Sequence, residues 1–239
     1  MPIALITGAN RGLGFEMVKI LAGRAGYTII ACCRTPEKAD ALRALAGAAT
    51  GVSIEALDVS DTDAIIGLAR QLAGTPIDIL ISNAGVFGKN PPATTGFQEQ
   101  QFGVSNFEDD WIVPYRVNVI GTMAIAEAFV EHLAASELKK LAVISSVVAS
   151  IEEAKGHMFG YAASKAAVNM TARNLAVALK PRGIIVNPIH PGYAKTDMSG
   201  PQAAIEPVVG AQGVIDRIEE MSLETSGAFL SYDGRSIPW

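Results

Sequence analysis

The sequence holds little of the chemistry that builds disulfide scaffolds or metal centres. Its 239 residues include two cysteines, Cys32 and Cys33, and three histidines. Adjacent cysteines in a strand point to opposite faces, so they exclude a disulfide framework and are expected to be buried thiols. No group of His, Cys, Asp or Glu has the spacing of metal ligands, and we expect no metal site. Free thiols indicate a reducing, cytoplasmic setting.

Positive charge and long apolar runs are also scarce. The formal net charge of −5 provides no basic surface for nucleic acid or anionic membrane. No uncharged apolar run reaches the about 18 residues of a membrane span, since Glu127 and Glu131 interrupt the best candidate. Residues 1–6 enter an apolar run without a basic segment or cleavage site, so no signal peptide is indicated. We expect neither nucleic acid nor membrane as a partner.

Apolar residues, by contrast, make up 49% of the chain and follow a regular pattern. Short apolar runs alternate with helix-length amphipathic segments, which is typical of βαβ units with a parallel sheet covered on both faces. Strands are predicted at Ile3–Thr7, Thr28–Cys33, Val52–Leu57, Ile77–Ser82, Leu141–Ser146, Ile184–Ile189 and Ala228–Tyr232. Helices are predicted near 12–25, 36–46, 61–73, 106–135, 157–180 and 207–221. No linker divides the chain, so residues 1–239 are expected to form a single α/β domain.

A glycine-rich turn follows the first predicted strand. It reads Thr7-Gly8-Ala9-Asn10-Arg11-Gly12-Leu13-Gly14 and leads into the first predicted helix. Glycines there allow a tight turn and let the backbone approach a pyrophosphate at the positive end of the helix. The spacing differs from the common G-x-G-x-x-G pattern, so the position carries more weight than the spacing. A glycine-rich turn between the first strand and the first helix predicts a dinucleotide site.

The end of the second predicted strand carries a cation. Enzymes that use NAD have a carboxylate near this position, whereas this chain has Arg34. A guanidinium can bind a 2′-phosphate through two hydrogen bonds, and Arg11 would add a second positive charge. We therefore predict NADPH/NADP⁺ as the preferred cofactor, with NAD(H) as the weaker alternative. A merely solvated Arg34 is the competing interpretation.

Tyr161 and Lys165 are spaced one helical turn apart. Residues i and i+4 lie on one face of a helix, and the alanines around this pair favour a helix. A phenol has a pKa of about 10, which a neighbouring ammonium lowers. A tyrosine tuned in this way can act as a general acid toward a carbonyl oxygen. Such a pair is weak evidence alone, because the spacing also occurs by chance on helix surfaces.

Together, these motifs resemble those of the short-chain dehydrogenase/reductase family, over nearly the whole chain. The matching segments are Thr7-Gly8-x-x-x-Gly12-x-Gly14, Asp58-Val59, Asn83-Ala84-Gly85, Asn118, Ser145-Ser146, Tyr161-x-x-x-Lys165 and Pro191-Gly192-x-x-x-Thr196. The ending SGAFLSYDGRSIPW is similar to the C-factor and sniffer-like carbonyl reductase branch. The resemblance implies a doubly wound Rossmann fold with about seven parallel strands, in the order 3-2-1-4-5-6-7.

The resemblance also implies a role for each matching position. Tyr161 would be the catalytic acid/base, and Lys165 would lower its pKa and bind the nicotinamide ribose. Ser146 would hydrogen-bond the substrate oxygen, and Asn118 would hold a water that links Lys165 to solvent. The implied cofactor contacts are Gly8, Asn10, Arg11, Gly12, Leu13, Gly14 and Arg34 around the phosphates, Asp58 and Val59 at adenine, Asn83, Ala84 and Gly85 along the channel, and Pro191, Gly192 and Thr196 beside the carboxamide.

Three departures from the family pattern affect the predicted pocket. Ala149 stands where glycine is usual, and 15 residues separate Ser146 from Tyr161, which leaves Ser145 as an alternative catalytic serine. The segment 197–206 is short, so the pocket is expected to be open. The long loop 86–104 is either a lid or pocket wall, or a surface excursion.

We predict an NADPH-dependent enzyme that reversibly reduces an aldehyde or ketone to the alcohol. The alternative is a C-factor-type signalling protein that binds the cofactor with little turnover. A sugar epimerase or dehydratase is disfavoured, because no substrate domain is appended after residue 225.

The predicted helix 157–180 is apolar on more than one face, and a homodimer or homotetramer is therefore expected.

Overall fold

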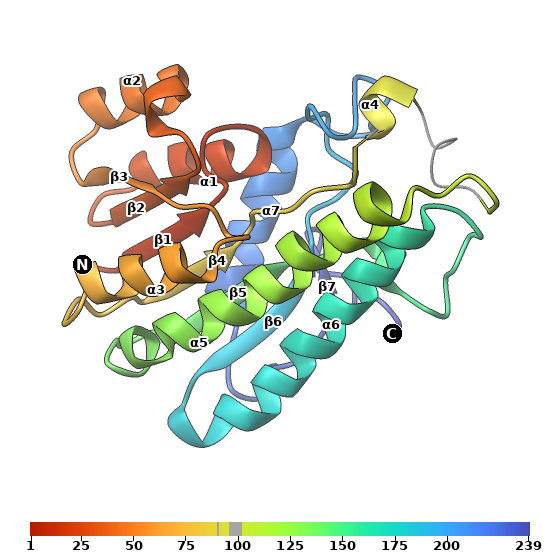
Figure 1. The fold of residues 1–239 in the computed structure, drawn as a ribbon. Helices are drawn as coiled ribbons and strands as arrows, with labels where there is room; N and C mark the ends of the chain where they lie inside the picture. The colour runs from red at the N-terminus through yellow and green to blue at the C-terminus, as the bar shows by residue number, and fades with distance from the viewer. Residues whose placement is uncertain (90, 96–101) are drawn as a thin grey trace.

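The computed structural model describes residues 1–89, 91–95 and 102–239, and seven of its strands form one parallel sheet (Figure 1). The strand order β3-β2-β1-β4-β5-β6-β7 confirms the prediction. Every neighbouring pair is parallel, with Ile3 beside Thr28 and Ile144 beside Ile189. The strands are β1 Ile3–Thr7, β2 Thr28–Cys33, β3 Val52–Ala56, β4 Ile79–Ser82, β5 Lys140–Ile144, β6 Ile185–His190 and β7 Leu230–Ser231.

Helices cover both faces of the sheet, because its strands are apolar on both sides. Ala4 and Ile6 of β1 face one core cluster, and Leu5 faces the other. Figure 1 shows α3, α5 and α6 on one face and α1 and α7 on the opposite face. The helices are α1 Gly12–Ala22, α2 Asp40–Ala48, α3 Thr62–Gln71, α4 Pro92–Thr95, α5 Gly121–Ala134, α6 Phe159–Leu179 and α7 Pro207–Glu220.

The predicted helix 106–135 is not uniform. It begins as two π-helical turns, η2 (Glu108–Ile112) and η3 (Tyr115–Ile120), and becomes α-helical only in α5. Pro114 lies between the two turns and has no N–H to donate, which explains why regular α-helical bonding does not run through this point. The predicted helix 36–46 is also divided, into the 3₁₀ turn η1 (Pro36–Lys38) and α2.

One helical stretch is long and apolar enough to cross a membrane by length and composition. It runs from Glu108 to Ala134, and 44% of its most apolar window is buried inside the protein. Ile125, Phe129 and Leu133 are fully buried on this stretch and belong to the core cluster under the sheet. These contacts are those of a core helix in a globular protein.

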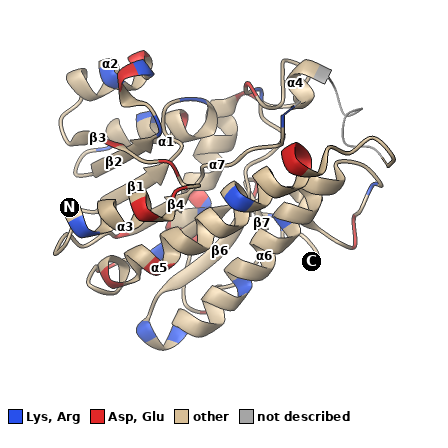
Figure 2. Ribbon diagram, in the orientation of Figure 1, with Lys and Arg blue, Asp and Glu red and all other residues tan. Residues whose placement is uncertain are grey.

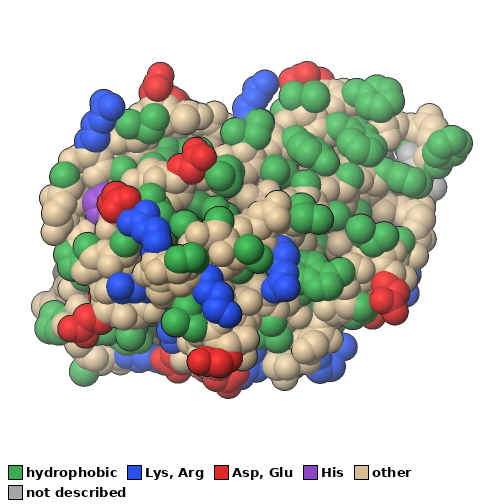
Figure 3. Space-filling model, turned by 90° about the horizontal axis from the view of Figure 1, so that it is seen from below, with side chains coloured by type: hydrophobic (Ala, Val, Ile, Leu, Met, Phe, Trp, Pro, Cys, Tyr) green, Lys and Arg blue, Asp and Glu red, His purple; other side chains and the backbone are tan. Residues whose placement is uncertain are grey.

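Charges of both signs share the surface. On the face that Figure 3 shows, Lys and Arg alternate with Asp and Glu, and hydrophobic side chains gather at the upper right. Ion pairs such as Arg182–Glu131, at 2.8 Å, are exposed and contribute little to stability. The two core clusters are therefore the main source of the fold's stability.

The start of α6 is fixed by a backbone contact. Gly160 lies directly against η2, where a Cβ atom would overlap the carbonyl oxygen of Asp110. Asp110 is buried, and its carboxylate accepts a hydrogen bond of 2.9 Å from the backbone N–H of Asn106. Only glycine allows α6 to approach η2 this closely, and the next residue is Tyr161.

Gly160→Ala is expected to lower the free energy of unfolding by about 1–3 kcal/mol, because the added methyl group overpacks a backbone contact. The matched control is Gly67→Ala in α3, where a Cβ atom would meet nothing within 4 Å. There the same substitution should raise the free energy of unfolding by about 0.5–1 kcal/mol through helix propensity. Urea unfolding measures both values, and equal effects of the two substitutions would contradict the proposed contact.

His190 ends β6 beside Ser231 of β7 and is 9% exposed. Its Nδ1 atom is buried and has no hydrogen-bond partner within the part of the chain that the structure describes. Burial lowers the pKa of His190 to about 4, with Asp233 acting to raise it and Arg235 acting to lower it. At neutral pH the imidazole is therefore uncharged.

The folded protein should lose stability as the pH falls from 6.5 toward 4. Over this range the unfolded chain protonates His190 and the folded protein does not, so protons favour unfolding. We expect the free energy of unfolding to fall by about 2 kcal/mol more, between pH 7 and pH 4.5, in the wild type than in His190→Gln. Urea titrations of both proteins at the two pH values measure this difference, and identical pH dependence would refute the assignment.

Candidate functional site

A cavity of about 610 Å³ opens at the carboxyl ends of the strands. Such a crevice is where open α/β sheets bind their ligands. Every residue that the sequence predicts for the cofactor and catalytic sites lines this cavity, with the exception of Asn118. The strand order brings residues that are far apart in the chain to one edge of the sheet.

The glycine-rich turn forms one wall of the cavity. Gly8 has a φ of 66°, which favours glycine, and a Cβ on Gly14 would overlap the carbonyl oxygen of Gly8. The Asn83 side chain donates to the carbonyl oxygens of Thr7, at 2.8 Å, and Gly8, at 3.2 Å. Asn83 therefore braces the turn from β4, in addition to lining the cavity. The open backbone fits the close approach of a pyrophosphate.

Cationic side chains lie at the end of the cavity formed by β2 and β3. Arg34 and Lys38 both line it, and Lys38 is a residue that the sequence motifs do not predict. Asp58 accepts hydrogen bonds from the backbone and hydroxyl of Ser60, at 2.9 and 2.7 Å. Although partial burial acts to raise it, these bonds and the charge of Arg34 hold the pKa of Asp58 below its usual range.

Arg11 also lines the cavity, and its charge is paired. Its guanidinium forms an ion pair of 2.9 Å with Asp197, on the segment that follows β6. The side chain lies over the rim of the cavity because the negative charge of Asp197 attracts it there. Arg11 lines the same cavity as Arg34, so its expected role as a second positive charge stays a prediction, and Lys38 is a further cation there.

Tyr161 lies in the first turn of α6 with its ring against Phe87, the ring centroids being 4.8 Å apart. Its neighbour Ser146 caps the short turn η4 (Val147–Ala149), where the hydroxyl oxygen accepts a bond from the N–H of Val148 at 3.4 Å. Burial raises the pKa of Tyr161 to about 12, and a hydrogen bond with Ser146 acts in the opposite direction. The phenol is therefore protonated at neutral pH.

Lys165 lies one helical turn further and is 5% exposed. Its ammonium donates a hydrogen bond of 2.7 Å to the carbonyl oxygen of Ile144 and lies 5.9 Å from the centre of the Tyr161 ring. Burial lowers the pKa of Lys165 to about 8. The expected lowering of the Tyr161 pKa by Lys165 does not prevail, because burial of the phenol, which raises its pKa, outweighs the hydrogen bond with Ser146, which lowers it.

The two serines after β5 have different surroundings. The Ser145 hydroxyl points under α6 and donates a hydrogen bond of 2.6 Å to the side-chain oxygen of Asn169. Ser146 faces the cavity beside Tyr161. Both serines line the cavity, but Ser145 is 2% exposed with its hydroxyl bonded to Asn169, whereas Ser146 is the one hydrogen-bonded to Tyr161.

Asn118 lies behind the cavity in η3 and links three elements. Its side chain exchanges two hydrogen bonds with the backbone of Val86, at 2.8 and 2.9 Å, and donates a third to the Ser164 hydroxyl, at 3.0 Å. A Cβ placed on Gly85 would lie 3.2 Å from Asn118 Oδ1 and 3.5 Å from Lys165 Nζ. Asn118 therefore lies close to Lys165, although it does not line the cavity.

The wall nearest Tyr161 is apolar, and much of it was not assigned from the sequence. The side chains that form it are Phe87, Pro92, Val147, Val148 and Met158. Met158 has the left-handed backbone φ of 55° directly before α6, a conformation rare for a long side chain. Phe87 and Pro92 belong to the predicted lid 86–104, of which residues 90 and 96–101 lie outside the described residues.

The described residues include no group of three His, Cys, Asp or Glu side chains that could hold a metal ion. What converges instead is a protonated phenol, a serine hydroxyl and a buried amine, next to a glycine-rich turn that can accept phosphates. This set can donate a proton to an oxygen atom and stabilise the charge that develops on it.

Comparison with known proteins agrees with this geometry. The family model described as short chain dehydrogenase matches residues 2–206. The C-signal protein of Myxococcus xanthus is 30% identical over 172 residues, covering 72% of this chain and 98% of its own. The carbonyl reductase Sniffer of D. melanogaster superposes with a TM-score of 0.89 at 25% identity, over 100% of this chain and 99% of its own.

A second solved structure, the NADPH-bound carbonyl reductase from chicken fatty liver, has a TM-score of 0.88 at 28% identity and covers all of both chains. These similarities confirm the predicted resemblance to the C-factor and sniffer-like branch. With a matching family model over most of its length, a sheet in the expected order and the family's motifs gathered at one cavity, this chain belongs to the short-chain dehydrogenase family of oxidoreductases.

Proposed function

We propose that the protein is an NADPH-dependent carbonyl reductase that converts an aldehyde or ketone to the alcohol. The observation that carries this proposal is the hydrogen-bonded pair of Ser146 and Tyr161, which shares one cavity with the glycine-rich turn. A proton donor beside a dinucleotide cradle is the arrangement that carbonyl reduction requires. Similar proteins include carbonyl reductases, one of them with NADPH bound.

NADP is favoured over NAD by the charges at the β2 end of the cavity. Arg34 and Lys38 would hold the 2′-phosphate there, and Gly8, Gly12 and Gly14 leave the backbone open for the pyrophosphate. Asp58 and Val59 would contact the adenine, and Pro191, Gly192 and Thr196 the carboxamide. Bound NADPH supplies the hydride.

The protein's own groups handle the charge and the proton at the carbonyl oxygen. Ser146 donates a hydrogen bond to that oxygen, and Tyr161, which is protonated at neutral pH, gives it the proton as negative charge develops. The ammonium of Lys165, close to the ring, then stabilises the phenolate. Asn118 provides the polar connection behind Lys165, through which the proton can be replaced. The apolar wall of Phe87, Val147, Val148 and Met158 holds the rest of the substrate.

Tyr161→Phe should lower the turnover of an aldehyde by about 10²–10⁴-fold, because it removes the proton donor and leaves the ring packing unchanged. Affinity for NADPH should remain within about twofold, since the phenol oxygen contributes little to a cofactor held along the whole cavity. Turnover is measured from NADPH absorbance with a panel of aldehydes, ketones and quinones, run in parallel with NADH. Affinity is measured by fluorescence titration.

Tyr27→Phe, far from the cavity, is the matched control and should leave both quantities unchanged. Wild-type rates in Tyr161→Phe would refute the mechanism. NADPH binding without turnover of any compound in the panel would favour the alternative function, a cofactor-binding signalling protein, which the similarity to C-signal brings into consideration.

We further propose that the protein assembles as a homodimer or homotetramer through α5 and α6. These helices lie side by side, and Figure 2 shows few charged residues along them. Three apolar side chains here are more than half exposed: Ile120, in the turn before α5, and Met170 and Val177 on α6. Met170 and Val177 are seven residues apart and so lie on one face of α6. A second copy related by a two-fold axis would remove these three apolar side chains from water.

Light scattering at micromolar concentration should give two or four times the chain mass of 25.0 kDa. Met170→Lys should shift the mass toward that of one chain, because it places a charge among the three exposed apolar side chains. Ile66→Lys, which changes an exposed isoleucine on α3, is the control and should leave the mass unchanged. A wild type with the mass of a single chain would contradict the proposed assembly.

A further inference from the structure

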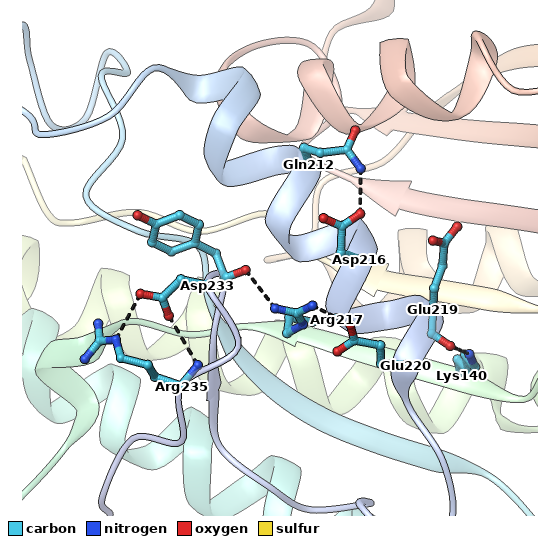
Figure 4. A network of polar contacts seen from close by, with 9 residues as sticks. Lys140, Gln212, Asp216, Arg217, Glu219, Glu220, Asp233 and Arg235 are labelled. Carbon is cyan, nitrogen blue, oxygen red and sulfur yellow. Dashed lines mark hydrogen bonds and ion pairs between the residues drawn. The ribbon is translucent and has the colours of Figure 1, made fainter.

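The segment after β7 begins with a turn that is held against α7. The last turn of α7 is itself fixed to the sheet by Lys140, whose ammonium donates 2.8 Å hydrogen bonds to the carbonyl oxygens of Ile218 and Glu219. Arg217 of α7 donates to the carbonyl oxygen of Tyr232 at 3.3 Å, and Arg235 pairs with Asp233 at 2.9 Å (Figure 4). The turn 232–235 is therefore braced by a rigid helix.

From this turn the chain runs back antiparallel to β7. Ser236 pairs antiparallel with Leu230, and the N–H of Ile237 donates to the carbonyl oxygen of Phe229 at 2.9 Å. The carbonyl oxygen of Trp239 then accepts a bond of 3.1 Å from the N–H of Glu152. The segment 236–239 thus connects the braced turn to the chain that follows Ser146.

Ile237 forms the centre of a small core that is separate from the two main clusters. It is 6% exposed and packs with Phe229 and Ala149, and Val147 lies partly buried against the same cluster. Ala149 and Val147 are the two ends of η4, the turn that Ser146 caps. Val147 also lines the cavity. One face of η4 therefore rests on Ile237, and another face forms the substrate wall.

We propose that Ile237 is a positioning residue for the η4 turn, which sets the place of Ser146 and the shape of the substrate wall. The kinetic part of its test rests on the proposed carbonyl reductase function, because it measures the rate of that reaction. Ala149 contacts this cluster through its apolar side chain, so removal of the Ile237 side chain leaves a void into which η4 can relax. Ser146 and Val148 would then shift relative to Tyr161, and small displacements of this kind reduce rates strongly.

The test compares Ile237→Ala with Ile65→Ala, which removes an equally large and fully buried side chain from α3, away from the cavity. For Ile237→Ala we expect kcat/KM for a bulky aromatic aldehyde to fall roughly tenfold, and to fall less for a small aldehyde. NADPH affinity should stay within about twofold, because the glycine-rich turn is not disturbed. Ile65→Ala should lower the thermal midpoint without changing the ratio of the kcat/KM values for the two aldehydes. Ile237→Val, which keeps most of the side chain, should return that ratio to the wild-type value.

Amide hydrogen exchange supplies a readout that does not depend on turnover. In Ile237→Ala, exchange should rise at residues 148–150 and stay unchanged in β1, whereas Ile65→Ala should leave 148–150 protected. Unchanged exchange at these residues, or an unchanged aldehyde ratio in an active enzyme, would overturn the inference. If the wild type reduces no carbonyl compound, the proposed function fails, and the exchange data alone decide whether Ile237 positions the turn.

Discussion

The hydrogen bond from the buried ammonium of Lys165 to the carbonyl oxygen of Ile144 is the contact on which the site depends. An ammonium inside a protein needs a partner, and the last carbonyl of β5 is the partner within reach. This bond fixes α6 against the end of β5, where Tyr161 and Ser146 meet. Ser164, the residue before Lys165, receives a hydrogen bond from Asn118, so the same turn of α6 also secures η3 and, through Val86, the segment that follows β4.

The cavity divides into two chemically different ends because of the strand order. The β2 end offers Arg34 and Lys38 and suits a phosphate, whereas the β5 and α6 end offers hydroxyl groups in an apolar wall and suits a carbonyl compound. The glycine-rich turn lies between them, braced by Asn83. The cations Arg34 and Lys38 therefore lie apart from the apolar wall, where the buried ammonium of Lys165 is close to Tyr161.

The sequence allowed the sheet to be predicted well, because strands buried on both faces leave unbroken apolar runs. β1 and β2 have the predicted bounds, and the other strands differ by one or two residues at their ends. The site motifs were found because glycines and the Tyr161–Lys165 pair are local in sequence. The π-helical turns, the pairing of Arg11 with Asp197 and the support of η4 by Ile237 were not predictable, because each depends on contacts between distant segments. The pKa of Tyr161 depends on burial, which periodicity does not reveal.

The contact between Gly160 and the carbonyl of Asp110 has a consequence for how the protein meets its substrate. Two backbones in direct contact have no rotatable side chain between them, so the first turn of α6 has few alternative conformations to lose. The hydroxyl of Tyr161 is thereby preorganised before any ligand enters, and substrate binding need not supply the entropy of assembling it. The shape of the cavity beside Tyr161 is thus set by the fold, and the affinity of a ligand there depends on the contacts that it makes and not on a rearrangement of α6.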